Sequence, residues 1–274
     1  MSPDPSTSPI STTRRSLRDT RAVLFDLDGC VYVGNSPLGG SKEIFAFLEE
    51  RGMPYCLITN NATKTPAQYV EKLAAMGIDI SERLMLTAGV ATALYLRQIE
   101  PAGAPIYIIG ERGMHEPLAE AGFWIDERNP KYVCVGLDQS LTYQKLKVAT
   151  LAIRHGARFI AANPDTTLPV EEGLVPGCGS ILSALVTATG VSPTVIGKPS
   201  REIVDLALGI IGSDRESTVI IGDRLDTDIP AGARAGIGTV LVLTGVHQPA
   251  DIPNYEDAPD FIVRDLHEFK RQLA

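Results

Sequence analysis

Short apolar segments of β type alternate with amphipathic segments of helical type along most of this 274-residue chain. The segments RAVLFD (21–26), PYCLIT (54–59) and TVIIGD (218–223) are almost wholly apolar, which is typical of strands covered on both faces of a sheet. The segments 41–52 and 200–212 place apolar residues at helical spacing and end in glycine. This alternation predicts an α/β fold with a doubly wound parallel sheet, right-handed crossovers and helices on both faces.

Three further elements are predicted for the same sheet domain. Thr65, Pro66 and Gln68 make a capping box with proline at the first helical position, so a helix is expected to begin there. The segments TVIG (194–197) and TVLVLTG (239–245) have the composition of buried strands.

The middle of the chain carries its own strands and a helix. The helical segment is TYQKLKVATLAIRHG (142–156), and the strand-like segments are 105–110, 132–136 and 158–165. A self-contained α/β set between two halves of another unit predicts an inserted cap domain. The expected division is a flexible Pro/Ser/Thr-rich tail at 1–20, a core domain at 21–100 plus 192–274, and the cap at 101–191.

The composition bounds the range of partners. The net charge is −8 and the basic residues are scattered, so nucleic acid and anionic membranes are poor partners. No apolar run is long enough to cross a bilayer, and the N-terminal segment lacks the apolar stretch of a signal peptide. The four cysteines, at 30, 56, 134 and 178, have no zinc-binding spacing. We therefore expect reduced thiols and a cytoplasmic location.

Two carboxylates follow the first predicted strand, two residues apart. Asp26 ends the strand, Asp28 comes next but one, and Gly29 permits a sharp turn. Side chains two residues apart project to the same side of an extended chain, so both are expected beyond the edge where open parallel sheets bind ligands. Such a pair can bind a hard cation, serve as nucleophile and acid/base, or flank a glycosidic bond.

Polar residues suited to phosphate chemistry follow three other predicted strands. Thr59 and Asn60 offer a hydroxyl, an amide and backbone N–H groups, and Lys198 offers a compact cation. Asp223 and Asp228 lie in the acidic loop GDRLDTD. Each strand end is weak evidence alone, whereas the four together indicate phosphoryl chemistry.

The order of these motifs resembles that of the haloacid dehalogenase (HAD) superfamily of phosphohydrolases. The segments DGCVY, ITNNAT, NPDTTLP, PGCGS, IGKPS and GDRLDTDI further resemble the branch that holds p-nitrophenyl phosphatases, phosphoglycolate phosphatases, pyridoxal phosphate phosphatases and NagD-type nucleotidases. The resemblance covers residues 21 to about 246. It implies a Rossmann-like core and a large α/β cap of C2 type inserted between the second and third motifs.

The resemblance also implies a role for each motif acid. Asp26 would attack phosphorus and form an aspartyl-phosphate, while Asp28 would act as general acid and then as general base. Mg²⁺ would be held by the Asp26 carboxylate, the Asp28 backbone carbonyl and Asp223. Asp228 would lie behind these ligands and orient a water on the metal.

Substrate binding falls to the remaining residues of the resemblance. Thr59, the Asn60 backbone and Lys198 would bind the phosphoryl oxygens. In the cap, Asn163 and Asp165 of NPDTTLP would shape the pocket for a small phosphorylated substrate. A homodimer formed through the cap is a further expectation from the resemblance.

Other functions fit parts of the pattern. The branch includes nucleotide and pyridoxal phosphate phosphatases, and the sequence does not decide between these substrates. A dehalogenase on the same fold lacks the second acid of D-x-D, so Asp28 argues against it. A phospho-accepting regulatory domain lacks a cap, so the inserted domain argues against that class. Asp226 fits either a metal site or the start of a helix, and the helix-cap role is favoured.

Overall fold

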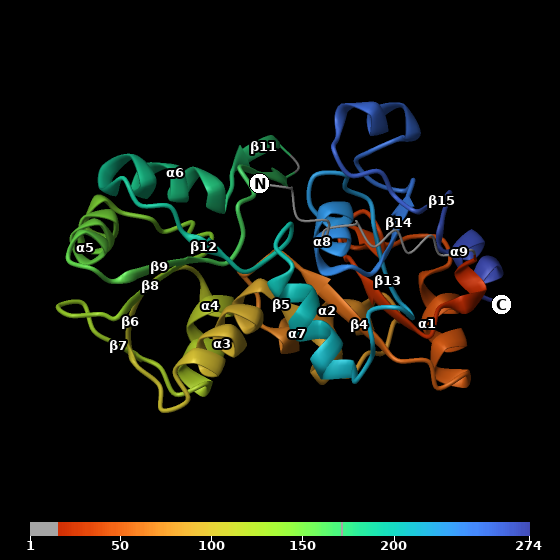
Figure 1. Cartoon of the computed structure of the whole chain (residues 1–274), viewed down its shortest axis with the longest axis horizontal. Coiled ribbons are helices and arrows are strands. Elements are labelled where there is room, and N and C mark those ends of the chain that lie inside the picture. The colour runs from red at the N-terminus through yellow and green to blue at the C-terminus, as the bar shows by residue number, and fades with distance from the viewer. Residues whose placement is uncertain (1–15, 171) are drawn as a thin grey trace, which may run out of the picture.

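The computed structural model describes residues 16–170 and 172–274, which form two α/β units side by side (Figure 1). Residues 1–15 of the expected tail lie outside the described residues. In residues 16–20, which the sequence assigns to the same tail, Leu17–Asp19 form a 3-10 turn capped by the Ser16 side chain. The apolar Leu17 side chain is buried and joins the core near the C-terminal helix.

The core sheet has the strand order β15-β14-β13-β1-β4-β5 within the described residues, and every neighbouring pair is parallel. Its strands are β1 (Ala22–Phe25), β4 (Tyr55–Thr59), β5 (Met85–Thr87), β13 (Thr218–Gly222), β14 (Gly238–Val242) and β15 (Phe261–Val263). The chain runs outward from β1 in one direction through β4 and β5, and in the other from β13 through β15. A switch point therefore lies between β1 and β13, where open parallel sheets bind ligands. The predicted doubly wound parallel core is confirmed.

Helices cover both faces of this sheet. One face packs against α1 (Ser41–Glu50), α2 (Pro66–Ala75) and α9 (Leu266–Leu273). The other packs against α3 (Ala88–Ile99), α7 (Glu202–Ile211) and α8 (Asp228–Ala235). The capping box predicted at the start of α2 is present, with Thr65 and Gln68 bonded reciprocally. Short elements complete the core: the hairpin β2 (Tyr32–Val33) and β3 (Ser36–Pro37), and the 3-10 turns η2 (Glu82–Leu84) and η3 (Pro249–Asn254).

The cap has a second parallel sheet with the order β12-β9-β8-β6-β7. Its strands are β6 (Pro105–Ile109), β7 (Trp124–Ile125), β8 (Tyr132–Val135), β9 (Arg158–Ala161) and β12 (Thr194–Val195). One face packs against α5 (Tyr143–Arg154) and α6 (Cys178–Thr189), and α4 (Arg112–Glu120) lies on the other. The antiparallel hairpin β10 (Thr167–Val170) and β11 (Gly173–Pro176) projects from this unit.

One predicted strand belongs to a different sheet than expected. The segment 194–197 was predicted as a core strand, but only Thr194–Val195 is extended, and it pairs with β9 in the cap sheet. That prediction was wrong, because so short a β-type segment fits the edge of either sheet. Lys198 consequently lies on the connection that returns from the cap to α7, and the cap sheet extends past the expected boundary at 191. The division into core and cap domains otherwise stays a prediction.

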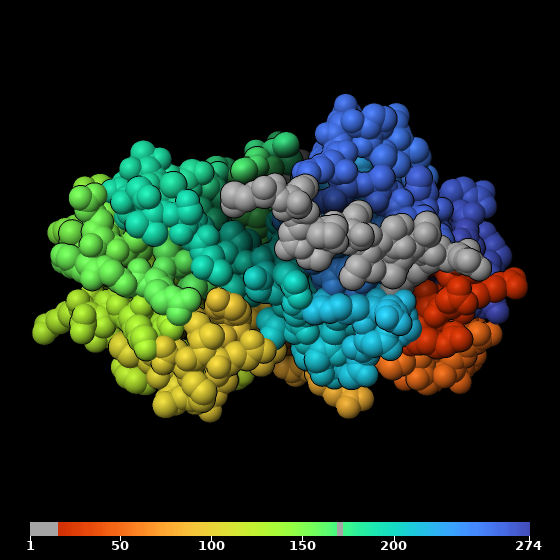
Figure 2. Space-filling view, viewed as in Figure 1, coloured from red at the N-terminus to blue at the C-terminus, as the bar shows by residue number. Residues whose placement is uncertain are grey.

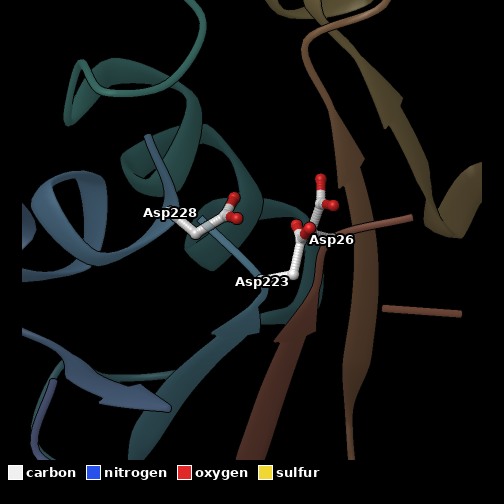
Figure 3. Close-up of side chains that lie close together, drawn as sticks. All are labelled: Asp26, Asp223 and Asp228. Carbon is white, nitrogen blue, oxygen red and sulfur yellow. The ribbon is translucent and has the colours of Figure 1, made fainter. Parts of the chain in front are cut away.

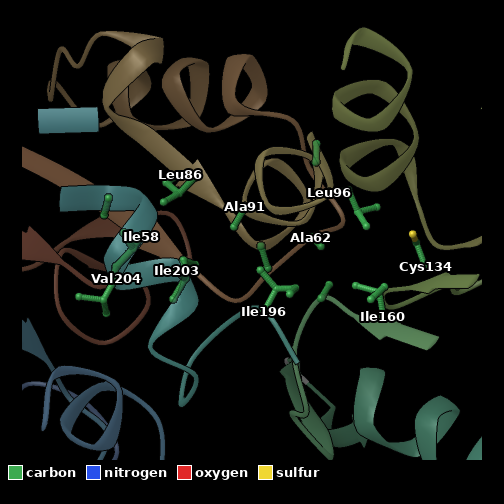
Figure 4. Packing of buried hydrophobic residues seen from close by; sticks show 14 of the residues in the cluster. Ile58, Ala62, Leu86, Ala91, Leu96, Cys134, Ile160, Ile196, Ile203 and Val204 are labelled. Carbon is green, nitrogen blue, oxygen red and sulfur yellow. The ribbon is translucent and has the colours of Figure 1, made fainter. Parts of the chain in front are cut away.

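Core and cap share one hydrophobic cluster (Figure 4). It contains Ile58 and Ile203 of the core together with Cys134 and Ile160 of the cap, all fully buried. The two lobes therefore meet along a continuous packed surface, and the space-filling view shows no break between them (Figure 2). Within the described ranges, no helix combines the length and the hydropathy that a bilayer span requires.

Candidate active site

Three aspartates gather at the carboxyl edge of the core sheet, at its switch point (Figure 3). Asp26 follows β1, Asp223 follows the neighbouring strand β13, and Asp228 begins α8. Each offers a carboxylate oxygen within 4.8 Å of the others, and all three residues are buried. Carboxylate oxygens are the ligands that hard cations prefer, so the three aspartates form a candidate metal centre.

Lys198 lies between two of these aspartates. Its Nζ donates to Asp26 Oδ1 and, at 2.6 Å, to Asp228 Oδ1, and only 2% of the residue is exposed. Burial lowers the pKa of Lys198, but the carboxylates of Asp228 and Asp26 outweigh this effect and raise it overall. Burial raises the pKa of Asp26 well above its ordinary value, against the attraction of Lys198. Three buried carboxylates and one ammonium leave an excess of negative charge that a bound cation would neutralise.

The carboxylate of Asp223 is held at one oxygen and lacks a partner at the other. Val246 N–H donates to Oδ2 at 2.7 Å, and a Cβ on Gly245 would lie only 1.9 Å from the same oxygen. Oδ1 is buried without a hydrogen-bond partner among the described residues. Burial, followed by the charge of Asp228, raises the pKa of Asp223 from 3.8 to about 6. A buried acceptor without a partner is costly, so this oxygen fits the role of a metal ligand.

A loop after β14, which the sequence analysis did not assign to the site, fixes the Asp223 loop. The backbone N–H of His247 donates to the Asp223 carbonyl oxygen at 3.2 Å. His247 Nδ1 accepts from Leu225 N–H at 3.1 Å, and its Nε2 lies 2.7 Å from the Tyr255 hydroxyl. These contacts tie the strand-end loop of β14 to that of β13. The available signal was the position of His247, two residues after a predicted strand.

Asp28 lies beside the acidic cluster, and its carboxylate is not a member of it. Gly29 adopts a left-handed conformation with φ 81°, which turns the chain sharply as predicted. Asp28 Oδ2 accepts from the Tyr32 hydroxyl at 3.3 Å. Asp28 keeps part of its surface in contact with solvent, but the surrounding protein desolvates its carboxyl group. This desolvation raises the pKa of Asp28, against the opposing effects of Lys72 and the Tyr32 hydrogen bond. The carboxyl group therefore retains a proton more readily than an ordinary aspartate does.

The loop after β4 joins the core to the cap. Thr59 and Asn60 are both buried at the end of this strand. Asn60 Nδ2 donates to Asp165 Oδ1 at 3.0 Å and to the Lys198 carbonyl oxygen at 2.8 Å. In turn, Asn163 Nδ2 donates to the Asn60 carbonyl oxygen at 2.6 Å. The predicted cap residues therefore lie against the predicted phosphate-binding loop.

Asp226 has a different role from the one favoured by the sequence. Its two oxygens accept from Arg224 Nε at 2.9 Å and Nη2 at 2.7 Å. Burial raises the pKa of Asp226, but the hydrogen bonds and charge of Arg224 lower it overall. Thr227 holds the N-cap position of α8, and its side chain makes no capping hydrogen bond within the described residues. The helix-cap assignment for Asp226 was wrong, because the bidentate arginine pair competes for its oxygens.

Comparison with known proteins gives the family of this chain. A sequence model described as haloacid dehalogenase-like hydrolase matches residues 23–124, and a HAD-hydrolase-like model matches residues 195–269. An acid sugar phosphatase from Staphylococcus aureus (strain USA300) is 42% identical over 258 residues, which cover 94% of this chain and 99% of that protein. The chain belongs to the haloacid dehalogenase-like hydrolase family.

Solved structures extend the likeness of this HAD-like hydrolase to both of its units. The 4-nitrophenylphosphatase from Thermotoga maritima is 36% identical with a TM-score of 0.89, and the match covers 94% of this chain and 99% of that one. NagD from E. coli K-12 is 35% identical with a TM-score of 0.86, and the match covers 91% of this chain and 98% of that one. The expected resemblance to the branch of p-nitrophenyl phosphatases and NagD is confirmed.

Proposed function

We propose that this HAD-like hydrolase is a Mg²⁺-dependent phosphomonoesterase that acts on small phosphorylated metabolites through an aspartyl-phosphate. The observation that carries the proposal is the buried group of Asp26, Lys198, Asp223 and Asp228 at the switch point of the sheet. It supplies a fixed carboxylate nucleophile, a cation for the transferred phosphoryl group and oxygen ligands for a metal.

Asp26 is the nucleophile of this proposal. Its position is set by the fully buried strand β1, and Lys198 holds one of its carboxylate oxygens. A carboxylate is a weak nucleophile, so its activity depends on being aligned with phosphorus and on neutralisation of the substrate's charge. The fixed backbone of β1 and the lysine contact support both requirements.

Asp28 is the proposed acid and base. Its raised pKa favours the protonated form that can donate to the leaving oxygen. After donation, the carboxylate is available to take a proton from the water that attacks the aspartyl-phosphate. Its separation from the acidic cluster supports this role, because proton transfer needs a carboxyl group that is not bound to metal.

Mg²⁺ is the proposed cofactor. Asp26 and Asp223 would hold it with the Asp28 backbone carbonyl, and the orphan Oδ1 of Asp223 supports that set. When bound, the ion would supply charge neutralisation and in-line orientation for the phosphoryl group. Asp228 is bonded to Lys198 and to Arg224 N–H, which favours a positioning role behind the ligands.

Thr59, the Asn60 backbone and Lys198 would bind the phosphoryl oxygens. All three residues are buried near the carboxyl edge of the core sheet, where Asp26 also lies. Burial reduces the competition of water for the phosphoryl oxygens. The cap residues Asn163 and Asp165 would shape the substrate pocket, and their contacts with Asn60 support a position beside it.

The relatives suggest more than one substrate class. They are named acid sugar phosphatase and 4-nitrophenylphosphatase, and the sequence motifs also resemble those of phosphoglycolate phosphatases. We therefore favour small phosphorylated metabolites of phosphoglycolate or sugar phosphate type. Nucleotides, as in NagD-type enzymes, and pyridoxal phosphate are the alternative.

A phosphate-release panel with Mg²⁺ tests the proposal. The substrates are p-nitrophenyl phosphate, phosphoglycolate, glycerol phosphate, pyridoxal phosphate and nucleoside monophosphates. Asp26→Asn is the matched blank, and we expect it to lower turnover by more than about a thousandfold while the folded state is kept. Turnover of the variant near that of the parent would overturn the nucleophile assignment, and no turnover of any ester by the parent would overturn the function.

A homodimer through the cap is the proposed assembly. On the outer side of the cap, α5 exposes 83% of Tyr143 and 46% of Leu151, beside a hollow of about 350 Å³ between α5 and α6. Exposed apolar side chains around a hollow favour association. Light scattering of the parent and of Tyr143→Glu tests this: a dimer that the variant converts to monomer supports it, and a monomeric parent contradicts it.

The cytoplasm is the proposed compartment. All four cysteines are buried free thiols, which is compatible with a reducing environment. Fractionation with an antibody against the chain measures this directly.

A further inference from the structure

Two lysines lie beside Asp28, outside the cluster that holds the nucleophile. Lys72, on α2, places its Nζ 3.7 Å from the centroid of the Tyr32 ring. The same tyrosine donates its hydroxyl to Asp28 Oδ2 at 3.3 Å. Because Tyr32 is fully buried, its ring is a fixed platform that connects Lys72 to the proposed acid.

Lys64 lies at the boundary between core and cap. The chain around it packs tightly on the first turn of α4, since a Cβ on Gly113 would lie 2.4 Å from the Lys64 carbonyl oxygen. Its side chain is exposed, and its charge acts on both Asp28 and Lys72. Lys64 therefore carries its charge near the place where the cap meets the core, close enough to Asp28 and Lys72 to act on both.

Neither lysine has a close counter-ion among the residues that the structure describes. Among the ion pairs of the part of the chain that the structure describes, none within 4.0 Å includes Lys64 or Lys72. Burial, together with the charge of Lys64 and against that of Asp28, lowers the pKa of Lys72. Asp28 supplies one negative charge for the two positive ones. The group therefore keeps a net positive charge that a ligand anion would balance.

The position of this charge distinguishes it from the phosphoryl site. The transferred phosphoryl group would lie against Asp26 and Lys198, whereas Asp28 contacts the leaving oxygen. Lys64 and Lys72 therefore lie on the leaving-group side of the reaction. A positive pair at that position is not needed for the phosphoryl group itself, and it would attract a second anion carried by the leaving group.

We propose that Lys64 and Lys72, with Tyr32 as their platform, form a subsite for a second anionic group on the leaving group of the substrate. The class of ligand is a phosphomonoester whose alcohol part carries a carboxylate or a second phosphate. This inference rests on the proposed function, because Asp28 marks the leaving-group side only if it protonates the leaving oxygen.

The test compares three esters on one two-carbon frame: 2-hydroxyethyl phosphate, phosphoglycolate, and ethane-1,2-diol bisphosphate. Only the last two carry a second anion, so they separate a carboxylate from a phosphate. Steady-state kinetics are measured for the parent, Lys72→Met, Lys64→Met and Lys72→Arg. Lys147→Met, an exposed lysine on α5 of the cap, is the matched control for lost surface charge.

We expect the parent to prefer at least one ester with a second anionic group over 2-hydroxyethyl phosphate in kcat/KM. Each methionine variant should raise KM for that ester about tenfold, as expected for a lost hydrogen bond to a charged group. KM for 2-hydroxyethyl phosphate and for p-nitrophenyl phosphate should change by no more than about twofold. Lys72→Arg should keep KM for that ester close to the value of the parent. Lys147→Met should leave KM unchanged for every ester.

Two results overturn the subsite: a parent without preference for a second anion, or variants that change all esters equally. Both leave the proposed function standing, since p-nitrophenyl phosphate is still hydrolysed. Absence of turnover with every ester refutes the proposed function instead, and the subsite with it.

Discussion

Replacing Asp223 by asparagine is expected to stabilise the metal-free protein while it removes activity. In the folded protein, burial and the neighbouring Asp228 raise the pKa of Asp223 to about 6, whereas its ordinary value is 3.8. Above pH 6 the folded state therefore carries a charge that the unfolded state accommodates better. Asparagine removes that charge, and its side-chain oxygen can still accept the Val246 N–H bond.

The magnitude follows from the difference between the two pKa values. One pKa unit corresponds to about 1.4 kcal/mol, so the charged form of Asp223 destabilises the metal-free protein by up to about 3 kcal/mol at pH 7.5. Between pH 6 and 3.8 the folded state binds more protons than the unfolded state, so this cost shrinks as the pH falls. At pH 4.5 about 1 kcal/mol remains by the same relation.

The assay is urea unfolding of parent and Asp223→Asn in EDTA at pH 7.5 and pH 4.5. At pH 7.5 we expect the free energy of unfolding of the variant to exceed that of the parent by up to about 3 kcal/mol. At pH 4.5 this difference should fall to about a third. Saturating Mg²⁺ should reverse the order at pH 7.5, because it binds and stabilises only the parent. A variant that is less stable in EDTA, or an advantage that does not depend on pH, would refute the reasoning.

Two further predictions concern the metal site. Chelation with EDTA should abolish turnover and added Mg²⁺ should restore it; activity that persists in EDTA would contradict the role of Mg²⁺. His247→Ala leaves Leu225 N–H without its acceptor and loosens the loop that holds Asp223, so we expect Mg²⁺ affinity, measured by calorimetry, to fall about tenfold. His115→Ala, an exposed residue on α4, is the control, and equal affinities of the two variants would argue against a positioning role.

The core sheet was predictable because its strands are buried on both faces. Segments such as TVIIGD contain almost no polar residue before the strand end, so their polar ends stand out. Asp26 and Asp223 do follow core strands, and Thr59 is the last residue of one. The motif order then identified the family, which the comparisons confirm. The assigned roles of the individual site residues stay predictions.

Features that depend on distant pairing were not predictable. The two-residue strand β12 belongs to the cap sheet only because β9 is its neighbour, so the return path that carries Lys198 could not be derived from local composition. The contacts of His247 and Val246 with the Asp223 loop depend on the adjacency of β13 and β14. The cap contacts of Asn60 join residues more than a hundred positions apart.

The central claim is that Asp26 carries the phosphoryl group, and Asp28→Asn offers the most direct measurement. With p-nitrophenyl phosphate the leaving group needs little help from an acid, so the first step should continue, slowed, while hydrolysis of the aspartyl-phosphate loses its base. Rapid mixing should release one p-nitrophenolate per active site in a burst. Acid quenching and peptide mass analysis should then find one phosphoryl group on Asp26, and none in the Asp26→Asn, Asp28→Asn double variant. A phosphoryl group on another residue, or steady turnover without any covalent label, would contradict the account.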